Sequence, residues 1–193
     1  SYDKFGTLAE IVADAALTVG QAWRITDRAD GIFDVVLAAS VTINTTSIVQ
    51  CVGAPTLAVS LRHDESTTID QYGAVGSVDE SSIFQDYADW ATLQTGITKM
   101  RCGFNKQYMA TDVTITTGTH LDLNGSTVKQ VPDAVEAIFH NISTTDTHTE
   151  DHIYISNGIL DGNSSSWAGD AQAFLVKLIS VHQFSVIDVI FTS

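Results

Sequence analysis

Leu123-Asn-Gly-Ser-Thr-Val128 is a turn-centred stretch that returns in related form further along the chain. It matches Ile155-Ser-Asn-Gly-Ile-Leu160, apart from one extra residue ahead of the second Asn-Gly pair. Val186-Ile-Asp-Val-Ile-Phe191 repeats the frame of the second copy, with Asp188 in the place of Asn157. The copies lie roughly 30 residues apart, a spacing that is typical of solenoid repeats.

Stacked coils of a β-solenoid account for this repeat. Each coil contributes two or three short strands whose apolar side chains point inward, while polar turn residues lie at the corners. One coil cannot bury its inner face alone, so the pattern predicts a stack. An immunoglobulin-like sandwich, which also has many short strands, is the alternative fold. The Asn-Gly pairs favour the solenoid because they recur inside similar frames and not at scattered hairpin tips.

A small α+β module is expected ahead of the solenoid, in residues 1–64. Thr7 and Glu10 have the spacing of a capping box and predict a helix over residues 7–16. Turn residues between two alternating segments predict a hairpin. The strands expected in this module cover residues 21–26, 32–37, 41–43, 48–52 and 57–61.

The polar run at residues 63–68 marks a domain boundary. Residues 65–98 are expected to form a linker, a first strand and a capping helix over residues 82–95. The apolar stripe of that helix is predicted to consist of Ile83, Tyr87, Trp90 and Leu93. Residues 99–193 then hold the first coils of the solenoid.

Composition narrows the classes of partner. The formal charge is −14, and the resulting electrostatic field repels phosphate backbones and anionic membranes. We therefore expect neither binding to nucleic acid nor insertion into a membrane. No apolar run is long enough for a transmembrane helix. Ser1–Phe5 lacks the pattern of a signal peptide and has no initiator Met, which suggests a longer product. Cys51 and Cys102 are expected to be reduced, buried side chains.

Ile69-Asp-Gln-Tyr-Gly-Ala-Val-Gly76 is followed by an acidic stretch and by the helix expected over residues 82–95. Together with the coils around Leu123 and Ile155, this segment makes residues 69–163 similar to the pectate-lyase-like family of right-handed parallel β-helices, in which an opening strand leads through an acidic linker into a capping helix. Met100–Ala110 occupies the place of the first coil. Leu121–Val128 resembles a recurring coil of the family, and Ile153–Asn163 resembles the coil that typically follows. Tyr72, a thin acidic linker and an altered turn after Cys102 depart from the usual pattern.

Residues 1–64 resemble the module that precedes such solenoids in tailed-phage tailspikes. The combined resemblance implies a mainly β fold: an incomplete, C-terminally open, right-handed parallel β-helix behind an α+β module and a capping helix. It further implies a homotrimeric virion protein of the phage tail, assembled in the host cytoplasm. Residues 1–64 would contact other tail proteins, and the full-length form would recognise and depolymerise host-surface polysaccharide, with the catalytic face outside residues 1–193.

Three functions stay open on the sequence: a tailspike fragment, a carbohydrate-active β-helix enzyme of bacterial type (lyase or glycoside hydrolase), and a non-catalytic structural adhesin. Polysaccharide hydrolysis uses paired carboxylates, and the candidates are Asp161, Asp170 and Asp188. Trp167 could stack on a sugar ring. Against these roles, Asp161 lies in an Asp-Gly-Asn turn sequence, Asp188 takes a corner position of the repeat, and Trp167 could instead anchor a loop or a trimer contact.

Metal and cofactor sites are not expected. His148 and His152 lie four residues apart with carboxylates between them, a spacing that could hold a metal on a helix. They fall in a Thr-rich segment between strands, which favours a solvated turn. The chain has no phosphate-binding loop, dinucleotide motif or Ser/His/Asp signature.

Overall fold

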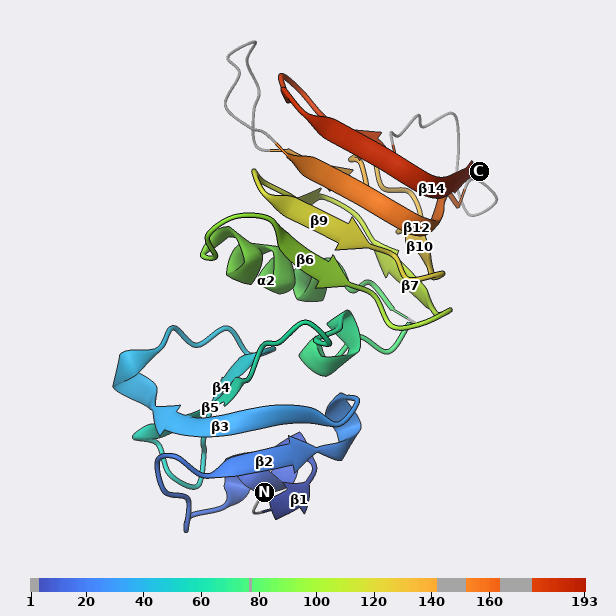
Figure 1. Cartoon of the computed structure of the whole chain (residues 1–193). Helices are drawn as coiled ribbons and strands as arrows, with labels where there is room; N and C mark the ends of the chain where they lie inside the picture. The colour runs from blue at the N-terminus through green and yellow to red at the C-terminus, as the bar shows by residue number, and fades with distance from the viewer. Residues whose placement is uncertain (1–3, 77, 142–151, 164–174) are drawn as a thin grey trace. The chain divides into compact units, whose positions relative to one another are not determined.

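The chain folds into two compact units, Ser1–Gly73 and Ala74–Ser193. The structure, a computed structural model, describes residues 4–76, 78–141, 152–163 and 175–193 (Figure 1). It is mainly β and contains parallel sheets. No helix in the described part of the chain is long and apolar enough to cross a membrane.

The first unit is built on a five-stranded mixed sheet. Its strand order is β1-β2-β3-β5-β4, with β1 parallel to β2 and the other neighbours antiparallel. The strands are β1 (Lys4–Gly6), β2 (Ala22–Ile25), β3 (Gly31–Leu37), β4 (Ile48–Gln50) and β5 (Leu57–Leu61), with short 3-10 turns η1 (Thr26–Arg28) and η2 (Ala38–Ser40). Its core includes Ile11, Ile25, Phe33 and Val59, all fully buried.

Local sequence signals in this unit are largely confirmed. The helix α1 (Leu8–Ala13) is shorter than expected but starts at the predicted capping box, in which Thr7 and Glu10 bond each other's backbone N–H groups. The predicted hairpin is the antiparallel pair β2–β3. The strand expected at residues 41–43 is wrong. The Asn44 Oδ1 accepts backbone N–H groups of residues 46, 47 and 48, which turns the chain there instead of extending it.

The first unit extends past the polar run at residues 63–68. The segment expected to form the opening strand is instead a 3-10 turn, η3 (Ile69–Tyr72). A capping box between Thr68 and Gln71 starts it, and Gly73 ends it with a φ of +106°, a conformation that favours glycine. Tyr72 is fully buried, so the turn belongs to the core of the first unit.

His63 makes the stability of this unit sensitive to acid. Its ring lies 5.4 Å from the Tyr72 ring, with Nε2 hydrogen-bonded to the Tyr72 hydroxyl. Burial lowers the pKa of His63 from 6.5 to about 4, while the Leu61 backbone and Asp64 oppose the shift. At pH values between about 4 and 6.5, His63 binds a proton in the unfolded chain but not in the folded unit. The stability of the unit therefore falls as the pH drops through this range.

We expect the unit to lose roughly 2 kcal/mol between pH 6.5 and pH 4.5 from this group. Urea denaturation of the full chain and of His63→Gln at both pH values measures the effect. The variant should lose less stability on acidification than the parent. Equal losses would assign the acid sensitivity to other groups.

The second unit is formed by parallel strands to which the chain returns repeatedly. In the first sheet, β6 (Thr98–Arg101) pairs with β9 (Thr119–Asp122), and β7 (Gln107–Ala110) pairs with β10 (Thr127–Gln130). The long strand β12 (Ile153–Asp161) pairs with both β9 and β10, and β14 (Phe184–Thr192) pairs with β12. A second parallel sheet consists of β8 (Val113–Thr114), β11 (Phe139–His140) and β13 (Val176–Lys177). The immunoglobulin-like alternative is therefore wrong for this unit, because the sheets of an immunoglobulin-like sandwich are antiparallel.

The register refines the internal repeat. Ile155 pairs with Val186, as the frame of the last two copies predicts, and Asn157 and Asp188 both have a positive φ. The match of Leu123 to Ile155 is wrong, because Leu121 is the residue that pairs with Ile155. The turn around Asn124 and Gly125 separates β9 from β10, whereas β12 continues through its Asn-Gly pair.

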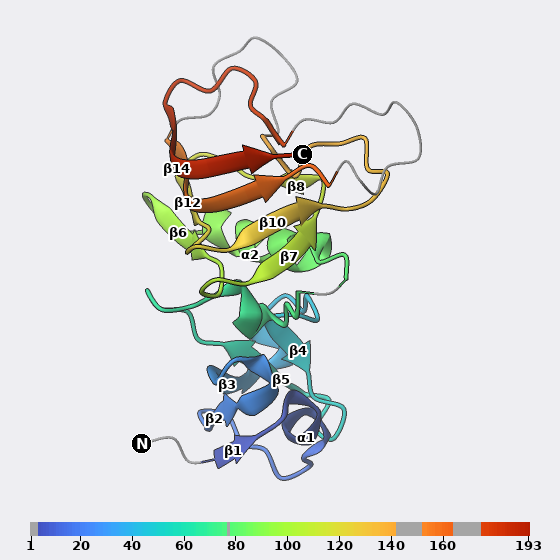
Figure 2. The same cartoon turned by 90° about the vertical axis from the view of Figure 1, so that its right-hand side faces the viewer.

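Helix α2 (Ser81–Thr92) lies at one end of the parallel stack, next to β6, and β14 lies at the other end (Figures 1 and 2). Its buried face consists of Phe84, Tyr87, Ala88 and Ala91. Of the predicted stripe, Tyr87 is buried and Ile83 and Trp90 are half-buried, whereas Leu93 is 80% exposed. The face of the helix that carries Phe84 is turned toward the strands, because the Phe84 ring packs against two strand residues.

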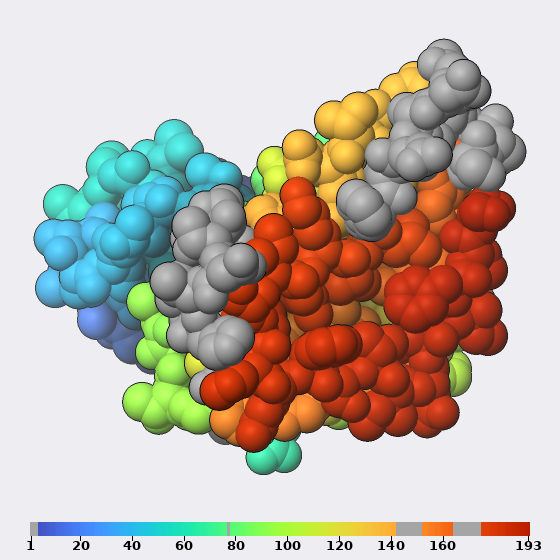
Figure 3. All heavy atoms as spheres, turned by 90° about the horizontal axis from the view of Figure 1, so that it is seen from above, coloured from blue at the N-terminus to red at the C-terminus, as the bar shows by residue number. Residues whose placement is uncertain are grey.

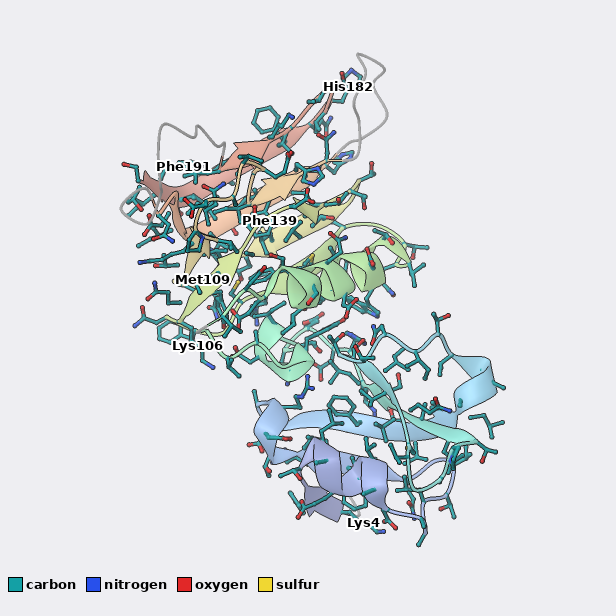
Figure 4. The ribbon with its side chains drawn as sticks, turned by 180° about the vertical axis from the view of Figure 1, so that it is seen from behind. Lys4, Lys106, Met109, Phe139, His182 and Phe191 are labelled. Carbon is teal, nitrogen blue, oxygen red and sulfur yellow. The ribbon has the colours of Figure 1, made fainter. Side chains whose placement is uncertain are left out.

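Those two residues are Tyr108 and Phe139, whose rings lie 5.9 and 5.8 Å from that of Phe84 (Phe139 is labelled in Figure 4). All three rings are fully buried. Cys102 is also buried, as is Cys51 in the first unit, which confirms the expected burial of both thiols.

The strand β14 leaves large apolar side chains exposed. Phe184, Val186 and Phe191 are 61%, 37% and 51% exposed, although their partners on β12 are at most 1% exposed. Strand β14 belongs to the broad red face in Figure 3. Among the described strands, β14 is thus the one whose core-facing side chains remain largely uncovered.

Candidate functional site

Two rows of outward-facing side chains run across the first parallel sheet of the second unit. Strand register aligns Lys99, His120, Tyr154 and Ser185 in one row, and Arg101, Asp122, Ser156 and Ile187 in the next. Between the rows, Met100, Leu121 and Ile155 point inward and are at most 1% exposed. Alternation along each strand therefore gathers polar groups from distant parts of the sequence on one face.

Asp122 is the centre of this polar cluster. Its Oδ2 lies 2.7 Å from Lys99 Nζ and 3.5 Å from Arg101 Nε, the latter an ion pair without a good hydrogen bond. Its Oδ1 accepts hydrogen bonds from Asn157 Nδ2 at 3.0 Å and from the Asn124 backbone N–H at 3.1 Å. The carboxylate is thus bound on both oxygens, and it connects three neighbouring strands.

The environment of Asp122 keeps it ionised at neutral pH. Burial raises the pKa of this carboxyl, but hydrogen bonds from Lys99, Asn157 and Asn124 and the charge of Lys99 outweigh burial, so the pKa lies below its ordinary value. An acid that donates a proton to a leaving group needs a raised pKa. Asp122 therefore suits an anchoring role rather than that of a proton donor.

His120 and Tyr154 form the aromatic part of the site. Their ring centroids lie 5.9 Å apart in an edge-to-face arrangement, and His120 Nε2 lies 3.0 Å from Ser156 Oγ. Burial lowers the pKa of His120, Lys99 lowers it further, Asp122 raises it, and Arg101 lowers it. The imidazole is consequently neutral at pH 7 and offers one N–H donor and one acceptor.

A hollow of about 390 Å³ lies on this face of the sheet. His120, Tyr154, Ser156 and Asn157 supply its polar groups, and Ile97 and Ile187 supply apolar walls; Ile155 also lines it, although its side chain is buried on the inner face. A second hollow of about 540 Å³ shares Ile97 and extends along Thr116–Gly118 to His152. Apolar walls with a few polar groups on rigid strands are typical of small-molecule sites.

The sequence-predicted candidates lie elsewhere. Asp161 lies at the end of β12, 3.6 Å from Lys129 Nζ, and its Oδ1 accepts the backbone N–H of Asn163 at 2.9 Å. Asp188 is exposed and adopts a left-handed conformation within β14. Asp170 and Trp167 lie outside the described residues. The structure therefore does not bring Asp161 and Asp188 into the polar cluster around Asp122.

The histidine cluster at residues 146–152 also lies outside the described part of the chain, except for His152. His152 lines the larger hollow and has a φ of +59°. In the described ranges, no group of three His, Cys, Asp or Glu side chains is arranged to hold a metal ion.

Sequence reasoning missed the cluster around Asp122, although a signal for it exists. Lys99-Met-Arg101, His120-Leu-Asp122 and Tyr154-Ile-Ser156 each place an apolar residue between two polar ones. Strand alternation puts the polar members on one face, but the sequence alone does not give the register that aligns the three segments.

Comparison with models of known protein families gave no match, and comparison with curated protein sequences also found none. The resemblance to tailspikes and pectate-lyase-like proteins therefore stays a prediction.

Proposed function

We propose that residues 74–193 form the first coils of a right-handed parallel β-helix, and that its outer sheet face binds polysaccharide. The observation that carries the binding proposal is the hollow in which Tyr154 and His120 lie beside Ser156 and Asn157. An aromatic ring gives a sugar an apolar surface, and imidazole, hydroxyl and amide groups match its hydroxyls. The repeated parallel return of the chain supports the β-helix.

The wider proposal is a tail protein of a phage virion, of tailspike or tail-fibre type, that recognises host-surface polysaccharide as a homotrimer. The small mixed-sheet unit ahead of the parallel sheets agrees with an attachment module for other tail proteins. The polar rows contain one carboxylate, Asp122, and it is held ionised, whereas glycoside hydrolysis typically uses two. The described face thus favours binding over cleavage, which suits a non-catalytic adhesin as well as a depolymerase that cuts elsewhere.

Replacement of Tyr154 by Ala is expected to weaken polysaccharide binding by about ten-fold, because burying a large apolar side chain contributes on the order of 1.5–3 kcal/mol. Tyr154→Phe should retain most of the affinity because it keeps the ring. Titration of the full chain against a panel of bacterial capsular and O-antigen polysaccharides, read out by calorimetry, measures the change.

Phe104→Ala is the matched control, because Phe104 is 76% exposed and does not line either hollow. It should bind as the parent does. If no polysaccharide in the panel binds, or if Tyr154→Ala binds like Phe104→Ala, the proposed site is wrong.

A further inference from the structure

We propose that Ser156 and His120 form a nucleophile–base pair that hydrolyses esters of short carboxylic acids bound in the hollow. Ser156 Oγ lies 3.0 Å from His120 Nε2, and both residues line the hollow of about 390 Å³. A serine hydroxyl within hydrogen-bond reach of an imidazole can be activated as a nucleophile. This activity goes beyond polysaccharide binding and does not depend on it, because it breaks an ester bond and no glycosidic bond.

Hydrogen bonds from neighbouring side chains point the Ser156 hydroxyl at His120. The carboxylate of Asp122 only accepts, so the Asn157 atom that lies 3.0 Å from Asp122 Oδ1 is the amide nitrogen, Nδ2. The same nitrogen lies 3.3 Å from Ser156 Oγ and donates its second hydrogen to it. The single hydrogen of the Ser156 hydroxyl is then left for Nε2 of His120, which makes the imidazole the acceptor.

His120 has the protonation state that a general base needs. Burial lowers its pKa, Lys99 lowers it further, Asp122 raises it, and Arg101 lowers it, so the ring is neutral at pH 7. The Tyr154 ring, 5.9 Å away in an edge-to-face arrangement, holds the imidazole in place. The charge of Asp122, two residues along the same strand, favours the imidazolium that forms when the base takes a proton.

The reaction balances with water as the only co-reactant. Ser156 Oγ bonds to the ester carbonyl carbon while its proton passes to Nε2 of His120, and the alcohol leaves with that proton as the ester C–O bond breaks. Water then attacks the acyl carbon and gives a proton to Nε2, and Oγ leaves the carbon and takes this proton. One alcohol and one carboxylic acid are released. The Asn157 hydrogen that faces Oγ lies next to the oxyanion of both steps and can donate to it.

The walls of the hollow indicate the kind of ester. Ile97 and Ile187 are 57% and 52% exposed, so their apolar surface is open to an acyl chain. The volume suits a small molecule. Acetyl and butyryl groups therefore fit against these walls, and the alcohol part of the ester can lie on the ring of Tyr154.

Turnover of p-nitrophenyl acetate and p-nitrophenyl butyrate by the full chain tests the activity. We expect saturable release of p-nitrophenol that falls by about 10²-fold or more in Ser156→Ala and in His120→Gln. Ser60→Ala on β5 and His140→Gln on β11 are the matched controls and should turn over as the parent does. The rate of the parent should rise with pH up to the lowered pKa of His120 and stay level above it, a profile that a purely structural role would not produce.

Asn157→Asp tests the orientation of the hydroxyl. Aspartate tolerates the φ of +61° at this position, but its carboxylate cannot donate to Ser156. We expect kcat to fall by about 10²-fold and KM to stay the same, because the walls that bind the ester are unchanged. An unchanged kcat would overturn the role of Asn157.

A fluorophosphonate reagent tests the nucleophile directly, also if Ser156→Ala unfolds. It forms a bond from phosphorus to an activated serine oxygen and releases fluoride and a proton. Mass spectrometry should find the label on Ser156 in the parent and in Ser60→Ala, and little of it in His120→Gln, with circular dichroism verifying each fold. Absence of saturable turnover, equal turnover by Ser156→Ala and Ser60→Ala, or a parent without label on Ser156 overturns the inference.

Discussion

Gly158→Ala should lower the free energy of unfolding of the second unit by about 3 kcal/mol or more. A Cβ at Gly158 would lie 2.4 Å from Leu123 Cβ and 2.5 Å from the Ser126 backbone oxygen. Gly158 sits inside β12, paired with Val189, so the backbone on both sides is fixed by strand pairing. The clash cannot be relieved by rotating a flexible side chain and has to displace the turn that separates β9 from β10.

Urea denaturation of the full chain measures this loss, and peptide-level hydrogen exchange over β12 assigns it to the second unit. Gly162→Ala is the matched control in the same segment of the chain. A Cβ there would meet Leu175 at 3.4 Å and the Thr192 oxygen at 3.6 Å, which are ordinary contacts. We expect the control to change stability by less than about 0.5 kcal/mol. Similar losses in both variants would mean that β12 does not approach the turn as closely as described.

Glu80→Ala should cost about 3 kcal/mol, because it leaves two backbone donors without their acceptor and opens a cavity. Glu80 is fully buried, and its Oε1 accepts the N–H groups of Val75 at 2.5 Å and Gly76 at 2.6 Å. Its own backbone N–H donates to the Met109 carbonyl at 2.8 Å. The residue thereby connects the segment before α2 to the parallel sheet.

Glu80→Gln keeps an oxygen that can accept these bonds, and we expect it to cost about 1 kcal/mol. Glu136→Ala removes an exposed glutamate and should be nearly neutral. Thermal unfolding of the three variants ranks them. An order in which the Gln variant is as damaging as the Ala variant would indicate that the charge of Glu80, and not its acceptor geometry, stabilises the segment.

The fold was predictable where local chemistry decides it. The capping box at Thr7 forms as expected, and the frame shared by Asn157 and Asp188 gives the correct pairing of β12 with β14. The register of Leu121 was not predictable, because a loop can absorb residues without changing the pattern on either side. The rotation of α2 was also missed, since the buried alanines Ala88 and Ala91 carry little signal in a hydrophobic stripe.

The candidate site was less accessible to sequence reasoning than the fold. Asp122 is next to an Asn-Gly turn and therefore looks like a turn residue, although it is the anchor of two cations. Its partners on β6 and β12 are far away in the sequence, so their proximity depends on long-range pairing. The predicted candidates Asp161 and Asp188 stand out in the local sequence because turn motifs surround them, but β12 and β14 place neither of them in the polar cluster around Asp122.

Because one side of β14 is uncovered, the strands of the parallel stack differ in the free energy that is needed to separate each of them from its neighbours. Strands such as β9 have neighbours on both sides, whereas β14 is held by β12 alone among the described strands. In a stack of this kind the stability of each strand depends chiefly on its nearest neighbours. Thermal fraying can therefore release β14 while β6 and β9 stay paired beside α2. The second unit then unfolds strand by strand, starting at β14.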